Sequence, residues 1–207
     1  MTHSPPPYFD PLSTDDLTKI ICSRFEREPS RSLATELPRF EGSGLYAIYY
    51  VSGADALYAP LTGYKIPVYV GQSRSHNSST GKLVRLKDPL WQRVSHHRQS
   101  IAGAANLELE DFGVRLLRLP DVHCDLGENG LRVGYQPVWN GILTGFGSNE
   151  QGEKTRKSAR SMWDTVHPGR RRTFGSEKHK AEDLREKVQQ RITEQIDTYS
   201  QLGWNHQ

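Results

Sequence analysis

Six side chains that could act together in catalysis occur in a fixed order along the chain. They supply two phenols, a guanidinium, an imidazole, a carboxylate and an amide, from Tyr46, Tyr69, Arg93, His97, Glu128 and Asn140. Hydrolysis of a phosphodiester requires a base for the attacking water and positive charge for the phosphate, often with help from a metal ion. The set could therefore cut a phosphodiester with one bound metal ion.

The two tyrosines lie in segments with the composition of β-strands. Residues 45–51 and 66–72 are rich in aromatic and β-branched side chains, which favour strands. Because side chains alternate between the two faces of a strand, Tyr46 and Tyr69 can point to the same side of a hairpin. The intervening residues 53–65 predict a loop. We expect the two phenols to meet on one face of the sheet.

A helix that begins at Asp88-Pro89 should carry the guanidinium and the imidazole. A carboxylate at the cap and a proline in the first turn are typical of helix starts. The apolar residues that follow recur at helical spacing together with His97, which predicts that His97 faces the body of the protein. Arg93 lies one turn earlier, on the same side of the helix.

Three further elements are expected around these residues. A helix should begin near Ser13, a third strand should span residues 112–119, and an amphipathic helix should span residues 181–198. Glu128 lies in a segment that could be helical. Three nearby glycines, at 127, 130 and 134, oppose that prediction because glycine destabilises helix interiors.

Composition limits the class of protein. A chain of 207 residues with 35% hydrophobic side chains suits one compact domain. No apolar run approaches the roughly 20 residues that cross a bilayer, and the first residues lack the apolar core of a signal peptide. Cys22 and Cys124 are typical of reduced thiols rather than of a disulfide framework or a zinc site. We expect a soluble, cytoplasmic protein with no membrane partner.

Positive charge is concentrated between residues 154 and 180. Nine lysines and arginines in this segment are opposed only by Asp164 and Glu177. Such a segment can neutralise DNA phosphates, although a solvated basic surface is the simpler alternative. The candidate DNA contacts are Arg156, Arg160, Arg170, Arg171 and Arg172.

The ordered set resembles the GIY-YIG nucleases. Gly44-Leu45-Tyr46 matches the first signature of that family and Tyr69-Val70-Gly71 the second, and the four later residues match its remaining site positions. Segments 40–47, 137–140, 145–147 and 163–170 are more closely similar to the type II restriction enzymes of this superfamily that cut the palindrome CCGCGG. The resemblance covers most of residues 37–170.

Two features set the chain apart from many members of the superfamily. A long insertion, from Tyr50 to Val68, separates the two signatures, and the restriction enzymes that the chain resembles share such an insertion. Gln72 stands where many relatives carry a basic residue after the second signature. A catalytic lysine is therefore not expected at that position.

The resemblance implies an α+β fold, with a small, mainly antiparallel three-stranded sheet flanked by helices. The chain would form one domain. Residues 1–40 would provide an arm and a helix, residues 41–142 the catalytic core, and residues 143–207 a basic DNA-binding segment and a C-terminal helix. The implied activity is metal-dependent hydrolysis of double-stranded DNA at a short palindrome, by a homodimer with a DNA methyltransferase as its genetic partner.

The resemblance also implies roles for the site residues. Glu128 would hold one Mg²⁺, a hard cation that prefers oxygen ligands. Arg93 would contact the phosphate oxygens. Tyr46 is the preferred base, with His97 accepting its proton, although the two roles could be exchanged. Tyr69 would orient the water or the phosphate, and Asn140 would fix this geometry.

Two other functions fit the same residues. One is a repair-type or homing-type nuclease of the superfamily, although such enzymes commonly carry a separate DNA-binding domain. The other is a nucleic-acid-binding protein without catalytic activity on the same scaffold. Cleavage of plasmid DNA into discrete fragments, nicking, or no cutting would distinguish the three.

Overall fold

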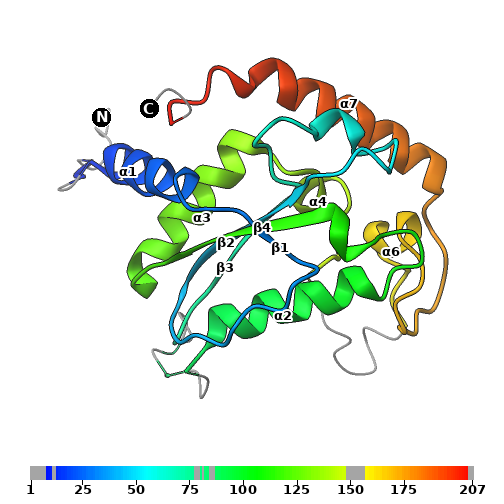
Figure 1. Cartoon of the computed structure of the whole chain (residues 1–207), viewed down its shortest axis with the longest axis horizontal. Helices are drawn as coiled ribbons and strands as arrows, with labels where there is room; N and C mark the ends of the chain where they lie inside the picture. Colours follow the sequence, from blue (N-terminus) through cyan, green and yellow to red (C-terminus); the bar gives the residue numbers. More distant parts are fainter. Residues whose placement is uncertain are drawn as a thin grey trace, which may run out of the picture.

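The computed structural model describes residues 8–10, 13–76, 80, 82–83, 87–147 and 157–204. Its centre is an antiparallel sheet with the strand order β1-β4-β2-β3, flanked by helices (Figure 1). The strands are β1 (Arg31–Ser32), β2 (Gly44–Tyr50), β3 (Tyr69–Ser73) and β4 (Phe112–Arg118). The predicted α+β class is confirmed. The two-residue strand β1 was not predicted, because so short a segment carries no periodic signal.

Helices pack on both faces of this sheet. Their bounds are α1 (Thr14–Glu26), α2 (Pro89–Ala102), α3 (Asp121–Tyr135), α4 (Val138–Gly141), α6 (Met162–Val166) and α7 (Ala181–Tyr199). Helix α2 covers one face, and α1 and α3 cover the other (Figure 1). Within the described residues, no helix has the length and apolar character of a membrane span. Cys22 and Cys124 are both buried and free.

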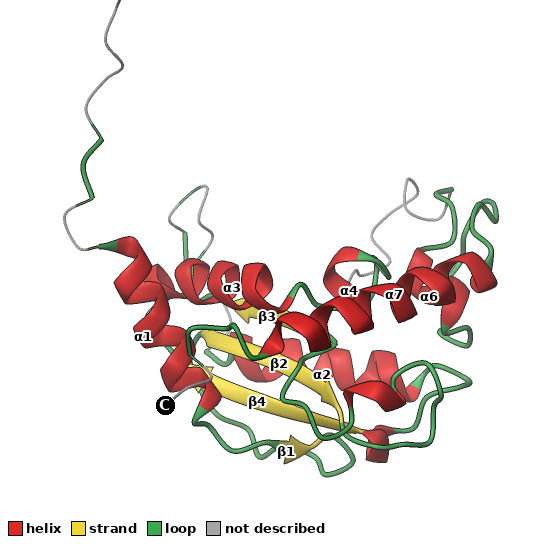
Figure 2. Ribbon diagram, turned by 90° about the horizontal axis from the view of Figure 1, so that it is seen from above, coloured by secondary structure: helices red, strands yellow, loops and turns green. Residues whose placement is uncertain are grey.

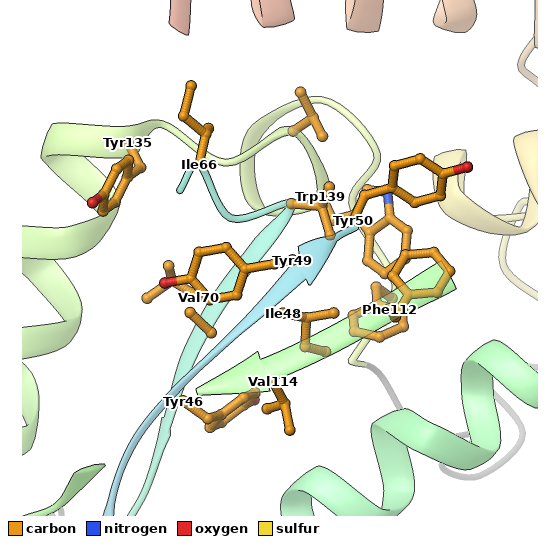
Figure 3. Packing of buried hydrophobic residues seen from close by; sticks show 14 of the residues in the cluster. Tyr46, Ile48, Tyr49, Tyr50, Ile66, Val70, Phe112, Val114, Tyr135 and Trp139 are labelled. Atoms are coloured by element: carbon orange, nitrogen blue, oxygen red, sulfur yellow. The ribbon is translucent and has the colours of Figure 1, made fainter. Parts of the chain in front are cut away.

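Strand β2 is the centre of the core, and all seven of its residues are buried. It pairs with β4 on one side and with β3 on the other, so that β3 and β1 form the two edges of the sheet (Figure 2). At one end of β2, Tyr50 packs against Phe112, which in turn packs against Trp139 (Figure 3). These large rings hold the sheet against the segment that follows α3.

The insertion between the two signatures is largely irregular, as expected of residues 53–65, but it contributes to the core. Leu57, Tyr58 and Leu61 are buried there. The Tyr58 hydroxyl accepts a hydrogen bond from Trp139 Nε1 at 2.9 Å and lies 2.6 Å from His167 Nε2. The insertion therefore ties the sheet to the C-terminal third of the chain.

Helix α3 is continuous despite its three glycines. A Cβ atom at Gly127 would overlap Leu45 of β2 and approach Ile21 to 2.8 Å, and one at Gly130 would lie 2.8 Å from the Cys22 sulfur. The glycines thus allow α3 to approach α1 and the sheet closely. Each glycine makes the helix less stable than alanine would, by about 1 kcal/mol. The packing of α3 against α1 and the sheet outweighs this cost.

Candidate active site

A buried tyrosine–histidine pair lies between β2 and α2. Tyr46 Oη is 2.6 Å from His97 Nε2, and neither residue is exposed to solvent. The pairing of Tyr46 with Gly71 across the hairpin explains the glycine of the second signature. Any Cβ at that position would overlap the Tyr46 hydroxyl. Both signatures therefore contribute to the same contact.

Tyr69 and Arg93 complete this cluster. The Tyr69 ring lies 6.0 Å from the Tyr46 ring and 5.1 Å from the His97 ring, measured between centroids. The Arg93 side chain lies beside both phenols and interacts with each of them. The expectation that the two phenols share one face of the sheet, beside the helix that carries Arg93 and His97, is confirmed.

The protonation states of the pair follow from its burial. Burial raises the pKa of Tyr46 well above its usual value, and Tyr69 raises it further, whereas the charge and hydrogen bond of Arg93 lower it. Burial also holds the pKa of His97 well below its usual value, and the charges of Arg93, His96 and Arg170 act in the same direction. At neutral pH the pair therefore consists of a phenol and a neutral imidazole, which can accept a proton.

Glu128 lies on the other side of strand β3. Gln72 follows Gly71 in β3 and, by alternation, points toward α3, where its Nε2 donates to Asp125 Oδ1 at 2.6 Å and its amide lies beside Glu128. The Glu128 side chain is 18% exposed, and burial raises its pKa. Glu128 is therefore separate from the tyrosine cluster, and strand β3 is the element that both adjoin.

The residues around Glu128 suit one hard cation. Magnesium is usually held by one or two carboxylates and retains several waters, so a larger protein cage is not needed. In the part of the chain that the structure describes, no group of three or more His, Cys, Asp or Glu side chains is arranged so that it could hold a metal ion. Beside Glu128, the Gln72 Oε1 atom is buried and has no hydrogen-bond partner among those residues. This oxygen could accept a hydrogen bond from a water that accompanies the ion.

Asn140 binds the free edge of β3. Its Nδ2 donates to the Val70 carbonyl at 2.9 Å, and its Oδ1 accepts from the Val70 N–H at 2.8 Å. The side-chain amide therefore takes the place of a neighbouring strand. Val70 lies between Tyr69 and Gly71, so these two bonds hold the whole second signature.

Residues 38–196 match the family model described as the Eco29kI GIY-YIG domain. The chain belongs to this family. No curated protein matches it. Membership in a restriction endonuclease family agrees with the α+β fold and supports a nuclease function for the site.

The basic segment of this GIY-YIG protein is only partly available to DNA. Arg156 lies outside the described residues. Arg171 is exposed, whereas Arg160 packs over Phe174 at 4.1 Å and pairs with Glu177 at 3.3 Å. We therefore still expect Arg160 and Arg171 to contact DNA phosphates.

Arg170 and Arg172 differ from what their sequence position suggests. The Arg170 side chain is 5% exposed, and its Nε donates to Asp164 Oδ1 at 2.6 Å. Arg172 is 16% exposed and lies 3.8 Å from the same carboxylate. Direct DNA contact by Arg170, one of the five candidate contacts, does not fit this geometry, because its guanidinium is bonded inside the protein.

Sequence reasoning missed one residue of the site, Phe146. Its ring stacks on His97 with centroids 4.6 Å apart and planes 15° apart, and it meets the Tyr69 ring edge-on at 5.0 Å. The signal was present in Gly145-Phe146-Gly147, one of the segments that carry the family resemblance. A phenylalanine offers no reactive group, so its place in the site becomes visible only in three dimensions.

Proposed function

We propose that this protein is a type II restriction endonuclease that hydrolyses both strands of double-stranded DNA at a short GC-rich palindrome. The resemblance described above favours CCGCGG as the site. The observation that carries the proposal is the buried contact between Tyr46 and a neutral His97, with Arg93 and Tyr69 beside it. This cluster therefore brings together a proton acceptor, His97, and a positive charge, Arg93.

The cluster can activate a water molecule through a proton relay. As the Tyr46 oxygen takes a proton from the water, its own proton passes to His97 Nε2, which lies 2.6 Å away. The positive charge of Arg93 stabilises the phenol oxygen during this transfer and is available to the phosphate oxygens. Tyr69, held within the same cluster, orients the water or the phosphate.

The proposed cofactor is one Mg²⁺ held by Glu128. When bound, such an ion polarises the phosphate and stabilises the leaving 3′ oxygen. Glu128 contributes its carboxylate, and Gln72 orients that carboxylate through its amide nitrogen. Because burial raises the pKa of Glu128, a bound cation would favour its ionised form.

Cleavage of a palindrome calls for two active sites related by a two-fold axis. The chain carries one set of site residues, so we propose that two copies act together on the DNA. The partners are therefore double-stranded DNA and a second copy of the chain, with a DNA methyltransferase as the expected genetic partner. Light scattering with a cognate duplex should show two chains per duplex.

Plasmid cleavage tests the proposal. A plasmid with one CCGCGG site, a plasmid without it and a pool of random sequences are each incubated with the protein, with and without Mg²⁺. Linear product from the first plasmid alone, only with the metal ion, is the expected result. Nicking without sequence preference would favour a repair-type or homing-type nuclease, and binding without any cutting would favour a silent module.

A further inference from the structure

One arginine outside the catalytic set is tied to the active site by an internal network. The Arg170 Nη1 atom donates to the Phe146 carbonyl at 2.8 Å, and Nη2 donates to the Gly145 carbonyl at 3.1 Å. Its Nε binds Asp164, and its guanidinium lies over the Trp163 ring at 4.3 Å. A planar fork of donors suits this task, since it can bind a carboxylate and two carbonyls at once.

The segment that Arg170 holds forms a wall of the active site. Phe146 stacks on His97. At Gly147, an added Cβ would lie 2.9 Å from His97 Cε1, 3.0 Å from Tyr69 Oη and 3.1 Å from Arg93 Nη2. Two consecutive residues of this wall therefore contact three of the side chains that the proposed reaction uses.

The His97 ring lies flat against this wall, and only one of its two nitrogens is hydrogen-bonded in the part of the chain that the structure describes. Its Nε2 faces Tyr46, whereas its buried Nδ1 has no hydrogen-bond partner within the described residues. In many catalytic histidines a carboxylate or carbonyl bonded to the second nitrogen fixes the ring. Here that nitrogen has no such bond to a described residue, and the flat face of the ring lies against Phe146 instead.

We propose that Arg170 is a positioning residue that, paired with Asp164, fixes Phe146 on the His97 ring and so orients His97 toward Tyr46. The effect of Arg170 on catalysis rests on the proposed function. The contact between Phe146 and His97 can be tested without measuring cleavage. It replaces the role in DNA binding that the sequence suggested for Arg170. A side chain that is 5% exposed has no free donor surface for a phosphate.

Two variants test the role of Arg170. Arg170→Lys keeps the charge and can pair with Asp164, but one ammonium group cannot also reach both carbonyls in the same plane. Phe146→Leu removes the stacked ring while leaving the arginine in place. Arg24→Ala is the matched control, because it removes an arginine of a surface ion pair on α1, with a side chain 64% exposed.

The first measurement is the NMR spectrum of the histidine rings, with circular dichroism confirming that each variant is folded. We expect Arg170→Lys and Phe146→Leu to shift the His97 ring signals in the same direction, since the first displaces the stacked Phe146 ring and the second removes it. Arg24→Ala should leave them unchanged. Unshifted His97 signals in folded Arg170→Lys protein would overturn the proposal.

The second measurement separates positioning from DNA binding. Single-turnover cleavage at saturating protein should fall by about 10²-fold in Arg170→Lys, as expected for misplacement of a reacting group by about 1 Å. Affinity for the cognate duplex should stay within about twofold. The double variant with Phe146→Leu should lose little more than the worse single variant, because both changes act through one contact.

The outcomes distinguish this inference from the proposed function. A wild-type protein that cuts no DNA would end the proposed function, yet the shifted His97 signals would still support the Arg170–Phe146–His97 contact. A cleavage loss in Arg170→Lys that is explained by weaker DNA binding, with His97 unchanged, would overturn the contact and leave the nuclease assignment intact.

Discussion

Replacement of Tyr46 by phenylalanine removes one oxygen atom from the centre of the site. The ring remains, so no cavity forms and Gly71 still packs against it. What disappears is the 2.6 Å contact with His97 Nε2 and the interaction with Arg93. The variant therefore asks whether the phenol oxygen takes part in the reaction or only fills space.

The two effects of this change have different expected sizes. Loss of a general base typically lowers the rate by ~10²–10⁴-fold, which corresponds to about 3–5 kcal/mol of transition-state stabilisation. The same change removes the partner of the buried His97 Nε2, so that neither ring nitrogen then has a hydrogen-bond partner among the described residues, at a cost of ~1–3 kcal/mol in folding. A domain with a stability of ~5–15 kcal/mol should remain folded.

The chain offers a matched control in a second buried tyrosine–histidine pair. Tyr58 Oη also lies 2.6 Å from a histidine nitrogen, Nε2 of His167, and it accepts a further bond from Trp139. Tyr58→Phe should therefore destabilise the protein at least as much as Tyr46→Phe but should leave cleavage close to that of the wild type. Urea denaturation gives the free energies of unfolding, and single-turnover cleavage of a cognate duplex gives the rates.

Two results would refute the reasoning. A cleavage rate within a few-fold of wild type in Tyr46→Phe would mean that the phenol is a packing residue and that His97 is the better candidate for the base. An equal loss of rate in Tyr58→Phe would mean that general destabilisation, and not the missing oxygen, explains the effect.

Three further variants have specific expected outcomes. Glu128→Gln should abolish plasmid cleavage but leave DNA affinity in gel-shift assays largely intact; cleavage at the wild-type rate would contradict the metal assignment. Arg171→Ala should weaken binding to cognate and scrambled duplexes equally and flatten the log–log salt dependence by about 0.9; an unchanged slope would mean that Arg171 contacts no phosphate. Burial lowers the pKa of His167 to about 3, so its folded form binds fewer protons than its unfolded form, and stability is lost as the pH falls below about 6.5. His167→Gln should therefore lose stability less steeply on acidification, by about 1.4 kcal/mol per pH unit, in urea titrations at pH 7 and pH 5.

The sequence predicted well those features that depend on local pattern. Alternation in two strands and one helical stripe were enough to bring Tyr46, Tyr69 and His97 to one place, because each side chain's direction follows from the period of its element. The fold class followed from the same elements. Local pattern works here because the reactive groups sit on regular structure and not on loops.

Features that depend on contacts between distant segments could not be predicted in this way. The glycines of α3 have a low helix propensity. The helix forms nevertheless because α1 and β2 pack so closely against it that larger side chains would not fit. Arg170 lies in a run of arginines that is typical of a DNA-binding surface. Its burial is decided by Asp164 and by two backbone carbonyls, which no charge count reveals.

Strand β3 explains why the site residues are so widely spaced along the chain. As the edge strand, it presents Tyr69 toward α2 and Gln72 toward α3, while its backbone edge is bound by Asn140. The tyrosine–histidine cluster and Glu128 thus lie on opposite faces of a single strand. Under the proposed roles, a phosphate at this edge would lie between the water-activating group on one face and the metal ligand on the other. Because in-line hydrolysis places the attacking and leaving oxygens on opposite sides of the phosphorus, an edge strand that separates two functions suits this reaction.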